Sequence, residues 1–117
     1  MVGIGTSTPV AGTKLDVNGG FKLGASGTAT KNSESFSSLV NISVPKNGST
    51  EITLGLPNGL SSTQASVAAS PSFDLPDGVF IAFARVIAPN ALKIRLINTA
   101  SSDQNVTGNF YCTVTEF

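Results

Sequence analysis

The sequence has no histidine and no tryptophan, only one cysteine, and charged residues make up just 12% of it. Without histidine, the usual zinc sites and histidine-based catalytic triads are excluded. The single cysteine excludes an intrachain disulfide. Because Cys112 alternates with Phe110 and Val114, we expect it to be a buried apolar side chain.

Charge of either sign is scarce, since seven basic residues balance seven acidic ones. Nucleic-acid binding needs a basic surface that releases counterions from phosphate, so we expect no nucleic-acid partner. No apolar run approaches the roughly 18–20 residues that span a bilayer, and we expect no membrane insertion. The surface must instead be covered by Ser, Thr, Asn and Gly, and a weakly charged surface of this kind tends to associate.

Three regions differ in composition. Residues 1–24 are rich in glycine, and residues 25–35 contain no large apolar side chain and read as a linker. Residues 36–117 carry the pattern of a β domain. A chain of 117 residues holds one domain with a short appendage, and its modest core would gain considerably from oligomerisation.

Period-two alternation of apolar and polar side chains predicts the strands. Residues 36–44 and 52–56 both alternate, and Asn47-Gly48 between them is a strong turn signal because both residues tolerate positive φ. We therefore expect these two segments to form a hairpin. Further strands are predicted at residues 65–69, 79–87, 92–97 and 110–115.

Residues 79–87 are apolar on both faces, which predicts a central strand covered on both sides. No segment has a convincing helical period, and Pro and Gly interrupt the chain at the short spacing that is typical of sandwiches and barrels. The expected fold is all-β, a jelly-roll-like antiparallel β-sandwich of about six to eight strands.

The most specific motif is V-G-I-G-T-S-T-P at residues 2–9, followed by K-L-D-V-N-G at residues 14–19. This pairing resembles a segment of the shaft in bacteriophage tail fibres, tail spikes and related trimeric surface fibres, where it precedes a C-terminal head domain. More loosely, the D-L-P-D-G-V turn at residues 74–79 and the A-R-V strand end at residues 84–86 resemble fibre-tip domains. The resemblance implies that residues 1–24 are a shaft or neck segment. It also implies a homotrimer located on a virion, extracellular after release, with a longer stalk before residue 1.

The expected trimer has two contact regions. Leu15 and Val17 would be buried together with their copies around the shaft axis. In residues 79–87, a second apolar face on a monomer would favour aggregation, so we expect neighbouring subunits to cover it. The residues assigned to this face are Phe80, Ala82, Ala84 and Val86. The alternative is that loops or the N-terminal segment of the same chain cover it.

The leading hypothesis for function is a receptor-binding head that recognises a glycan or protein of the host bacterial surface through polar loops, residues 58–64 and 101–109. The predicted contact residues are Asn58, Ser61, Ser62, Asp103, Gln104 and Asn105. The lack of Trp, and the position of Tyr111 within a predicted strand, weaken a sugar site on a single chain. The alternative is a purely structural trimerisation and capping domain of a viral fibre or a capsid decoration.

Catalytic and metal sites are not expected, and no cofactor is predicted. Asp74 and Asp77 could suggest paired carboxylates for glycoside hydrolysis, but both flank a Pro-Gly turn in which Asp is common. Residues 103–105 contain one carboxylate, too few for a calcium site. Arg85 either pairs with a carboxylate such as Asp74 or Glu116 at a subunit interface, or it is solvated. The chain is expected not to be an enzyme.

Overall fold

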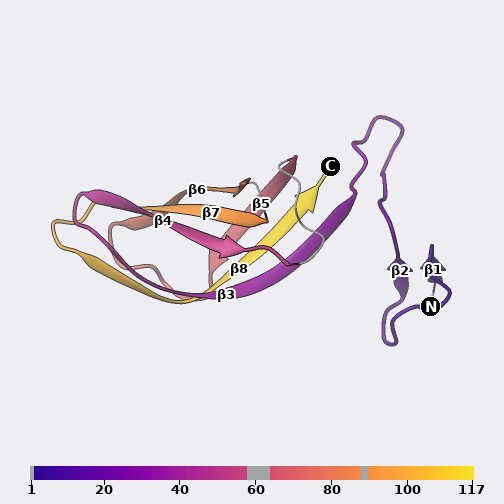
Figure 1. The fold of residues 1–117 in the computed structure, drawn as a ribbon, viewed down its shortest axis with the longest axis horizontal. Helices are drawn as coiled ribbons and strands as arrows, with labels where there is room; N and C mark the ends of the chain where they lie inside the picture. The colour runs from indigo at the N-terminus through magenta and orange to yellow at the C-terminus, as the bar shows by residue number, and fades with distance from the viewer. Residues whose placement is uncertain (1, 58–63, 88–89) are drawn as a thin grey trace.

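The chain folds as an all-β protein in which every defined element is a strand (Figure 1). The structure, a computed structural model, describes residues 2–57, 64–87 and 90–117. Its strands are β1 Val2–Ile4, β2 Leu15–Val17, β3 Asn32–Val44, β4 Gly48–Gly55, β5 Ala65–Pro71, β6 Val79–Ile87, β7 Ala91–Asn98 and β8 Gln104–Glu116. Nothing in these residues forms a helix that could cross a membrane.

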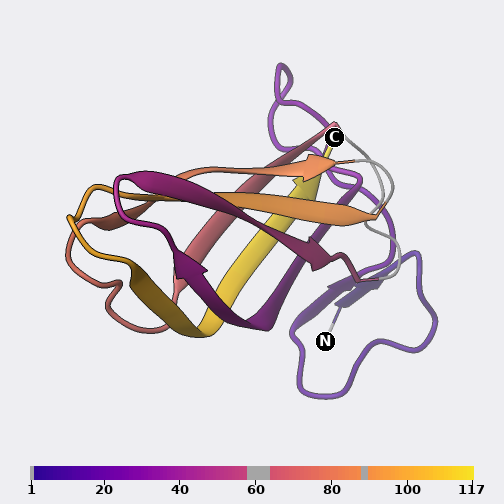
Figure 2. The same ribbon diagram turned by 60° about the vertical axis from the view of Figure 1, so that its left-hand side comes forward.

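Two three-stranded antiparallel sheets make up the body of the molecule, one in the order β3-β8-β5 and the other in the order β4-β7-β6. They lie face to face as in a β-sandwich (Figure 2). Each strand contributes its inward-pointing alternate residues to the core between the sheets. The fully buried apolar side chains are Val44 from β3, Leu92, Ile94 and Leu96 from β7, and Val106, Phe110, Cys112 and Val114 from β8. The predicted antiparallel all-β fold is confirmed, and so is the burial of Cys112.

The predicted hairpin between residues 36–44 and 52–56 is wrong. The turn at Asn47, with φ of 50°, does reverse the chain, but it carries the chain from one sheet to the other. β3 pairs with β8 along its whole length, and β4 pairs with β7. The apolar faces of β3 and β4 therefore meet across the core instead of side by side, because alternation defines which side of a strand is buried but not which strand is its neighbour.

Strand β6 also differs from the prediction, since it lies at an edge of its sheet and not at the centre. A β-bulge at Ala82 breaks its register, so that Ile81 lies opposite Leu96 while Phe83 lies opposite Arg95. Every side chain beyond the bulge changes face. The period-two assignment of residues 79–87 consequently fails in its second half.

At one end of the sandwich the N-terminal segment stands apart from the two sheets (Figure 1). There, β1 and β2 form a two-stranded parallel sheet, and Phe21 pairs with Thr30 in an isolated antiparallel bridge. β3 begins at Asn32, inside the range predicted to be a linker, because Asn32 pairs with Glu116 near the end of β8. The whole molecule is elongated, with extents of 56 × 30 × 25 Å.

Candidate functional site

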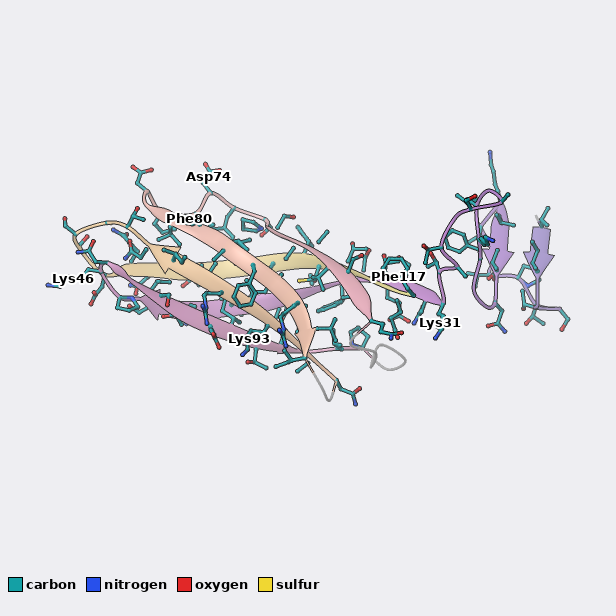
Figure 3. The ribbon with its side chains drawn as sticks, turned by 90° about the horizontal axis from the view of Figure 1, so that it is seen from above. Lys31, Lys46, Asp74, Phe80, Lys93 and Phe117 are labelled. Carbon is teal, nitrogen blue, oxygen red and sulfur yellow. The ribbon has the colours of Figure 1, made fainter. Side chains whose placement is uncertain are left out.

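The end of the sandwich opposite β1 and β2 is here named the distal tip. It consists of the β3–β4 turn around Lys46, the β7–β8 loop at residues 99–103, and the turn before β6 at residues 76–78 (Figure 3). These connections meet because Gly48, Asn98 and Val79 lie opposite one another across the β4-β7-β6 sheet.

Asn98 holds the distal tip together. Its side chain is 1% exposed, and its amide nitrogen donates to the carbonyl oxygens of Val44 and Ser102, each at 3.0 Å. Its amide oxygen accepts from the backbone N–H of Ala100 at 2.8 Å. One buried side chain therefore hydrogen-bonds to backbone groups at the end of β3 and in the β7–β8 loop.

Further hydrogen bonds connect the three parts of the distal tip. The Asp103 carboxylate accepts from the backbone N–H of Lys46 at 2.9 Å, and the Ala100 carbonyl accepts from the N–H of Asn47 at 3.2 Å. Both the N–H and the hydroxyl of Thr99 donate to the Gly78 carbonyl. The distal tip is therefore a preorganised surface, since its loops bond to one another as well as to the sheets.

The predicted receptor-binding residues do not all lie in loops. Asp103 lies at the distal tip and is engaged in the Lys46 bond, and Gln104 is half-buried and donates to the Ser102 hydroxyl. Asn105 is exposed on the outer side of β8. Residues 104–109, predicted as loop, belong to β8 because they pair with β3. Asn58, Ser61 and Ser62 lie outside the described residues.

The outward side of the β3-β8-β5 sheet, here named the polar face, carries Ser, Thr and Asn almost throughout. Cross-strand hydrogen bonds join Ser35 to Thr113 at 2.8 Å and Asn41 to Thr107 at 2.9 Å. Tyr111 lies in the central strand of this face with 55% of its surface exposed. Sequence reasoning discounted Tyr111 because it lies in a strand, although its alternation with buried Phe110 already placed it on the outer side.

The outward side of the β4-β7-β6 sheet is here named the mixed face. It does not carry all four residues that the sequence assigned to an interface on β6. Val86 is 5% exposed within the core and cannot contact a neighbouring subunit, and half-buried Ala84 packs against that core instead of pointing outward. The bulge is the cause, because it rotates both side chains inward. Phe80 and Ala82 remain exposed, and Phe80 pairs across the strands with Ile97.

Charged groups accompany the apolar ones on the mixed face. Glu51 forms ion pairs with Arg95 and with Lys93, the latter at 3.2 Å, and the Arg95 guanidinium lies 5.0 Å from the centre of the Phe83 ring. The hydrogen bond from Arg95, followed by the one from Lys93, lowers the pKa of Glu51 below its usual value near 4.5.

The lowered pKa of Glu51 predicts a small pH effect. A depressed folded-state pKa contributes stability that is present above the unfolded pKa and is lost as the pH falls through the folded pKa. Glu51→Gln should therefore lower the melting temperature slightly at pH 7, and the difference from wild type should be smaller at pH 3. Thermal unfolding followed by circular dichroism measures this. Thr53→Ala, on the same strand face, is the control, and an equal Glu51→Gln effect at both pH values would contradict the assignment.

A second candidate surface lies at the other end, on the N-terminal segment. Val2 pairs with Leu15 and Ile4 with Val17, so that all four side chains share one side of the parallel sheet. Val2, Ile4 and Leu15 are each more than half exposed. Three of the four side chains line an open hollow together with Phe21 and Leu23; they are those of Ile4, Leu15 and Val17.

No catalytic or metal site emerges in the parts of the chain that the structure describes. Asp74 and Asp77 are both exposed on the connection between β5 and β6, and no cluster of three or more His, Cys, Asp or Glu side chains occurs among these residues. Arg85 is exposed and takes part in neither ion pair found there. Burial raises the pKa of the Cys112 thiol, which disfavours the reactive thiolate.

No protein-family model matches the chain, and no curated protein or solved structure matches it. The candidate surfaces are the distal tip, the polar face, the mixed face and the apolar side of the N-terminal segment.

Proposed function

We propose that the chain is the end of a homotrimeric viral fibre, in which residues 1–24 belong to the shaft and residues 36–117 form a head that binds the surface of a host bacterium. The V-G-I-G-T-S-T-P and K-L-D-V-N-G segments support the fibre assignment by resemblance. The observation that carries the trimer is the open apolar side of the β1–β2 sheet. This protein would be part of the virion.

The β1–β2 sheet needs partners for physical reasons. Parallel sheets are found almost exclusively with both faces covered, and a two-stranded unit is at best marginally stable in water. Each strand here has only three residues, and Leu15 is 58% exposed. Three copies placed around an axis would bury Leu15 and Val17 of each chain together, and they would add backbone partners to the free strand edges.

The mixed face is the better candidate for contacts between heads. It carries exposed Phe80 next to Ile97, whereas the polar face is covered by hydroxyl and amide groups. Aromatic side chains and Arg are enriched in protein interfaces, and the mixed face carries both. We propose that the mixed face lies toward the trimer axis through Phe80, and that the polar face lies toward solvent.

The strand pairing supports a jelly-roll-like fold for the head. β3 pairs with β8, and β4 pairs with β7. The inner pair is thus nested within the outer pair along the chain, which is the order of a long hairpin rolled into a jelly roll. β5 and β6 then add to the remaining edges of β8 and β7. We propose that the head is a reduced jelly roll whose distal tip lies farthest from the shaft.

A purely structural role, in which the head only joins and caps three chains, is the second candidate. One observation favours it: the Asp103 carboxylate and the Asn98 amide at the distal tip are both occupied by bonds within the chain. Labelled intact protein tested on a panel of bacterial cells separates the two roles, because a receptor-binding head retains label on host cells. A trimer that binds no cell in the panel would favour the capping role.

The trimer itself is tested by mass. Light scattering should give about three times 11.9 kDa for the chain, and a monomer would overturn the proposal. The double variant Leu15→Ser with Val17→Ser should shift the mass toward the monomer, because it removes apolar surface from the axis. Val10→Ser is the matched control: Val10 is 62% exposed on the same segment but does not line the hollow, so its variant should remain trimeric.

A further inference from the structure

We propose that Tyr111 and the side chains around it on the polar face form a binding platform for an uncharged saccharide chain. This inference deepens the proposed recognition of a host surface and rests on it. It assigns the ligand a chemical class, and it places the site on a sheet face instead of the loops at the distal tip.

Tyr111 lies in the middle of the polar face. It is in β8, the middle strand of the sheet, opposite Ser37 on β3 and Ser70 on β5. Asn109 and Thr113 flank it on the same side of β8, two residues away in each direction. A shallow depression lies next to the ring, between Ser35 and Ser37 on one strand and Tyr111 and Thr113 on the other.

This arrangement matches the two sides of a sugar ring. A pyranose ring has an apolar C–H face and a rim of hydroxyl groups. An exposed tyrosine ring offers an apolar surface that loses little conformational freedom on binding, together with a polar hydroxyl. Small polar groups around such a ring fix the orientation of the ligand. Tyr111 supplies the surface for stacking, and Ser37, Ser70 and Asn109 supply the groups for the rim.

The neighbouring polar groups are partly ordered before a ligand arrives. Ser35 and Thr113 hydrogen-bond to each other, which holds two hydroxyls in place. A hydroxyl has one donor and two acceptor sites, so this pair keeps capacity for a ligand. The side chains of Ser37 and Ser70 form no hydrogen bond with any described residue, so their hydroxyls are available to a ligand.

The lack of charged residues on the polar face favours an uncharged ligand. Its outward positions on β3, β8 and β5 hold Ser, Thr, Asn, Ala, Leu and Tyr, with no charged residue. An acidic sugar would lose hydration there without gaining a cationic partner, which is unfavourable. A second copy of the chain also fits poorly, because Leu39 and Tyr111 are the only large apolar side chains at the outward positions of β3, β5 and β8 as the structure describes them, and interface cores need more apolar surface.

The sequence provides a direct probe, since Tyr111 is the single tyrosine and tryptophan is absent. Tyrosine fluorescence therefore reports on this ring alone. Neutral oligosaccharides of glucose, galactose and N-acetylglucosamine would be titrated into the intact protein, with oligogalacturonate as the charged counterpart. We expect a saturable change with at least one neutral series and none with oligogalacturonate. No response to any neutral series, or a stronger response to oligogalacturonate, would overturn the proposal.

Variants then separate stacking from hydrogen bonding, with affinity for the responding saccharide measured by calorimetry. Tyr111→Ala should weaken binding about tenfold or more, as truncation of an aromatic anchor does, whereas Tyr111→Phe keeps the ring and should lose less. Thr53→Ala, on the opposite outer side of the sandwich, is the control and should bind as wild type. Equal affinity of Tyr111→Ala and wild type would refute the site.

Two further results distinguish this inference from the proposed function. If the wild-type protein and Tyr111→Ala bind host cells equally, the saccharide platform is wrong and the receptor-binding function stands. If saccharides change the fluorescence but the protein is a monomer that binds no cell, the platform stands and the proposed function fails. Acrylamide quenches the fluorescence of an exposed tyrosine. If Tyr111 is quenched in the monomer but not in the trimer, a second copy covers the polar face, and the platform is wrong.

Discussion

Gly108→Ala should lower the free energy of unfolding by about 3 kcal/mol, through overpacking and backbone strain together. A Cβ at position 108 would lie 2.4 Å from two ring atoms of Phe73. The ring cannot easily move, because it packs edge-on against fully buried Phe110 with 5.9 Å between the ring centres. Gly108 also has φ of 151°, a conformation that residues with a side chain rarely adopt.

Urea unfolding at one fixed protein concentration measures this effect, since the stability of an oligomer depends on concentration. Gly55→Ala is the matched control: Gly55 is also in a strand, but a Cβ there would have no neighbour within 4 Å, so a change within about 0.5 kcal/mol is expected. Adding Phe73→Ala should make the Gly108→Ala step less costly, because the two sites are in contact. Equal effects of Gly108→Ala and Gly55→Ala would contradict the packing account.

Asn98→Ala should destabilise the protein by about 2–4 kcal/mol, because it removes three hydrogen bonds between a buried side chain and buried or part-buried backbone groups. The groups affected are the carbonyls of Val44 and Ser102 and the N–H of Ala100. Asn105→Ala is the control, since Asn105 is exposed and its loss should matter little. Urea unfolding provides the measurement.

Asn98→Asp sharpens the test because it keeps the shape and replaces the donor. The introduced carboxylate would face two carbonyl oxygens, which repel it and raise its folded-state pKa. A raised folded pKa means that stability is recovered as the pH falls and the carboxyl is protonated. Asn98→Asp should therefore lie closer to wild type at pH 4 than at pH 7. If the loss of unfolding free energy in Asn98→Asp does not change with pH, the amide donor of Asn98 is not what holds the distal tip.

Alternation predicted where strands lie because it is a local property. The segments at residues 65–69 and 92–97 fall within β5 and β7, and residues 15–17 of the shaft motif coincide with β2. β8 was predicted too short, because Gly108 and the polar residues before it hide the alternation, although Val106 is fully buried. Its first half is recognised as strand only through its pairing with β3.

The residues that share each candidate surface could not be predicted from alternation, because a bulge and the pairing of distant strands decide which side chains lie together. The sign of the bulge at Ala82 in the sequence is Arg85, which an unbroken period-two strand would place on the core face with Val79 and Ile81. The effect of the bulge is to place Val86 in the core and to leave Phe83 outside beneath Arg95. Tyr111 was visible as an outward residue, but the sequence did not show that Ser37 and Ser70 flank it, because they come from strands far away in the chain.

The sequence by itself determined that the chain is all-β, that Cys112 is buried, and that no histidine-based chemistry is available. Composition and period-two alternation are sufficient for these conclusions, because each depends on neighbours a few residues apart. Only the tertiary structure decided that β3 and β4 lie in different sheets, that β6 is an edge strand, and that Tyr111 lies at the centre of an uncharged face. Strand partners are chosen by packing across the whole core, and that choice is made between residues as distant as Asn32 and Glu116.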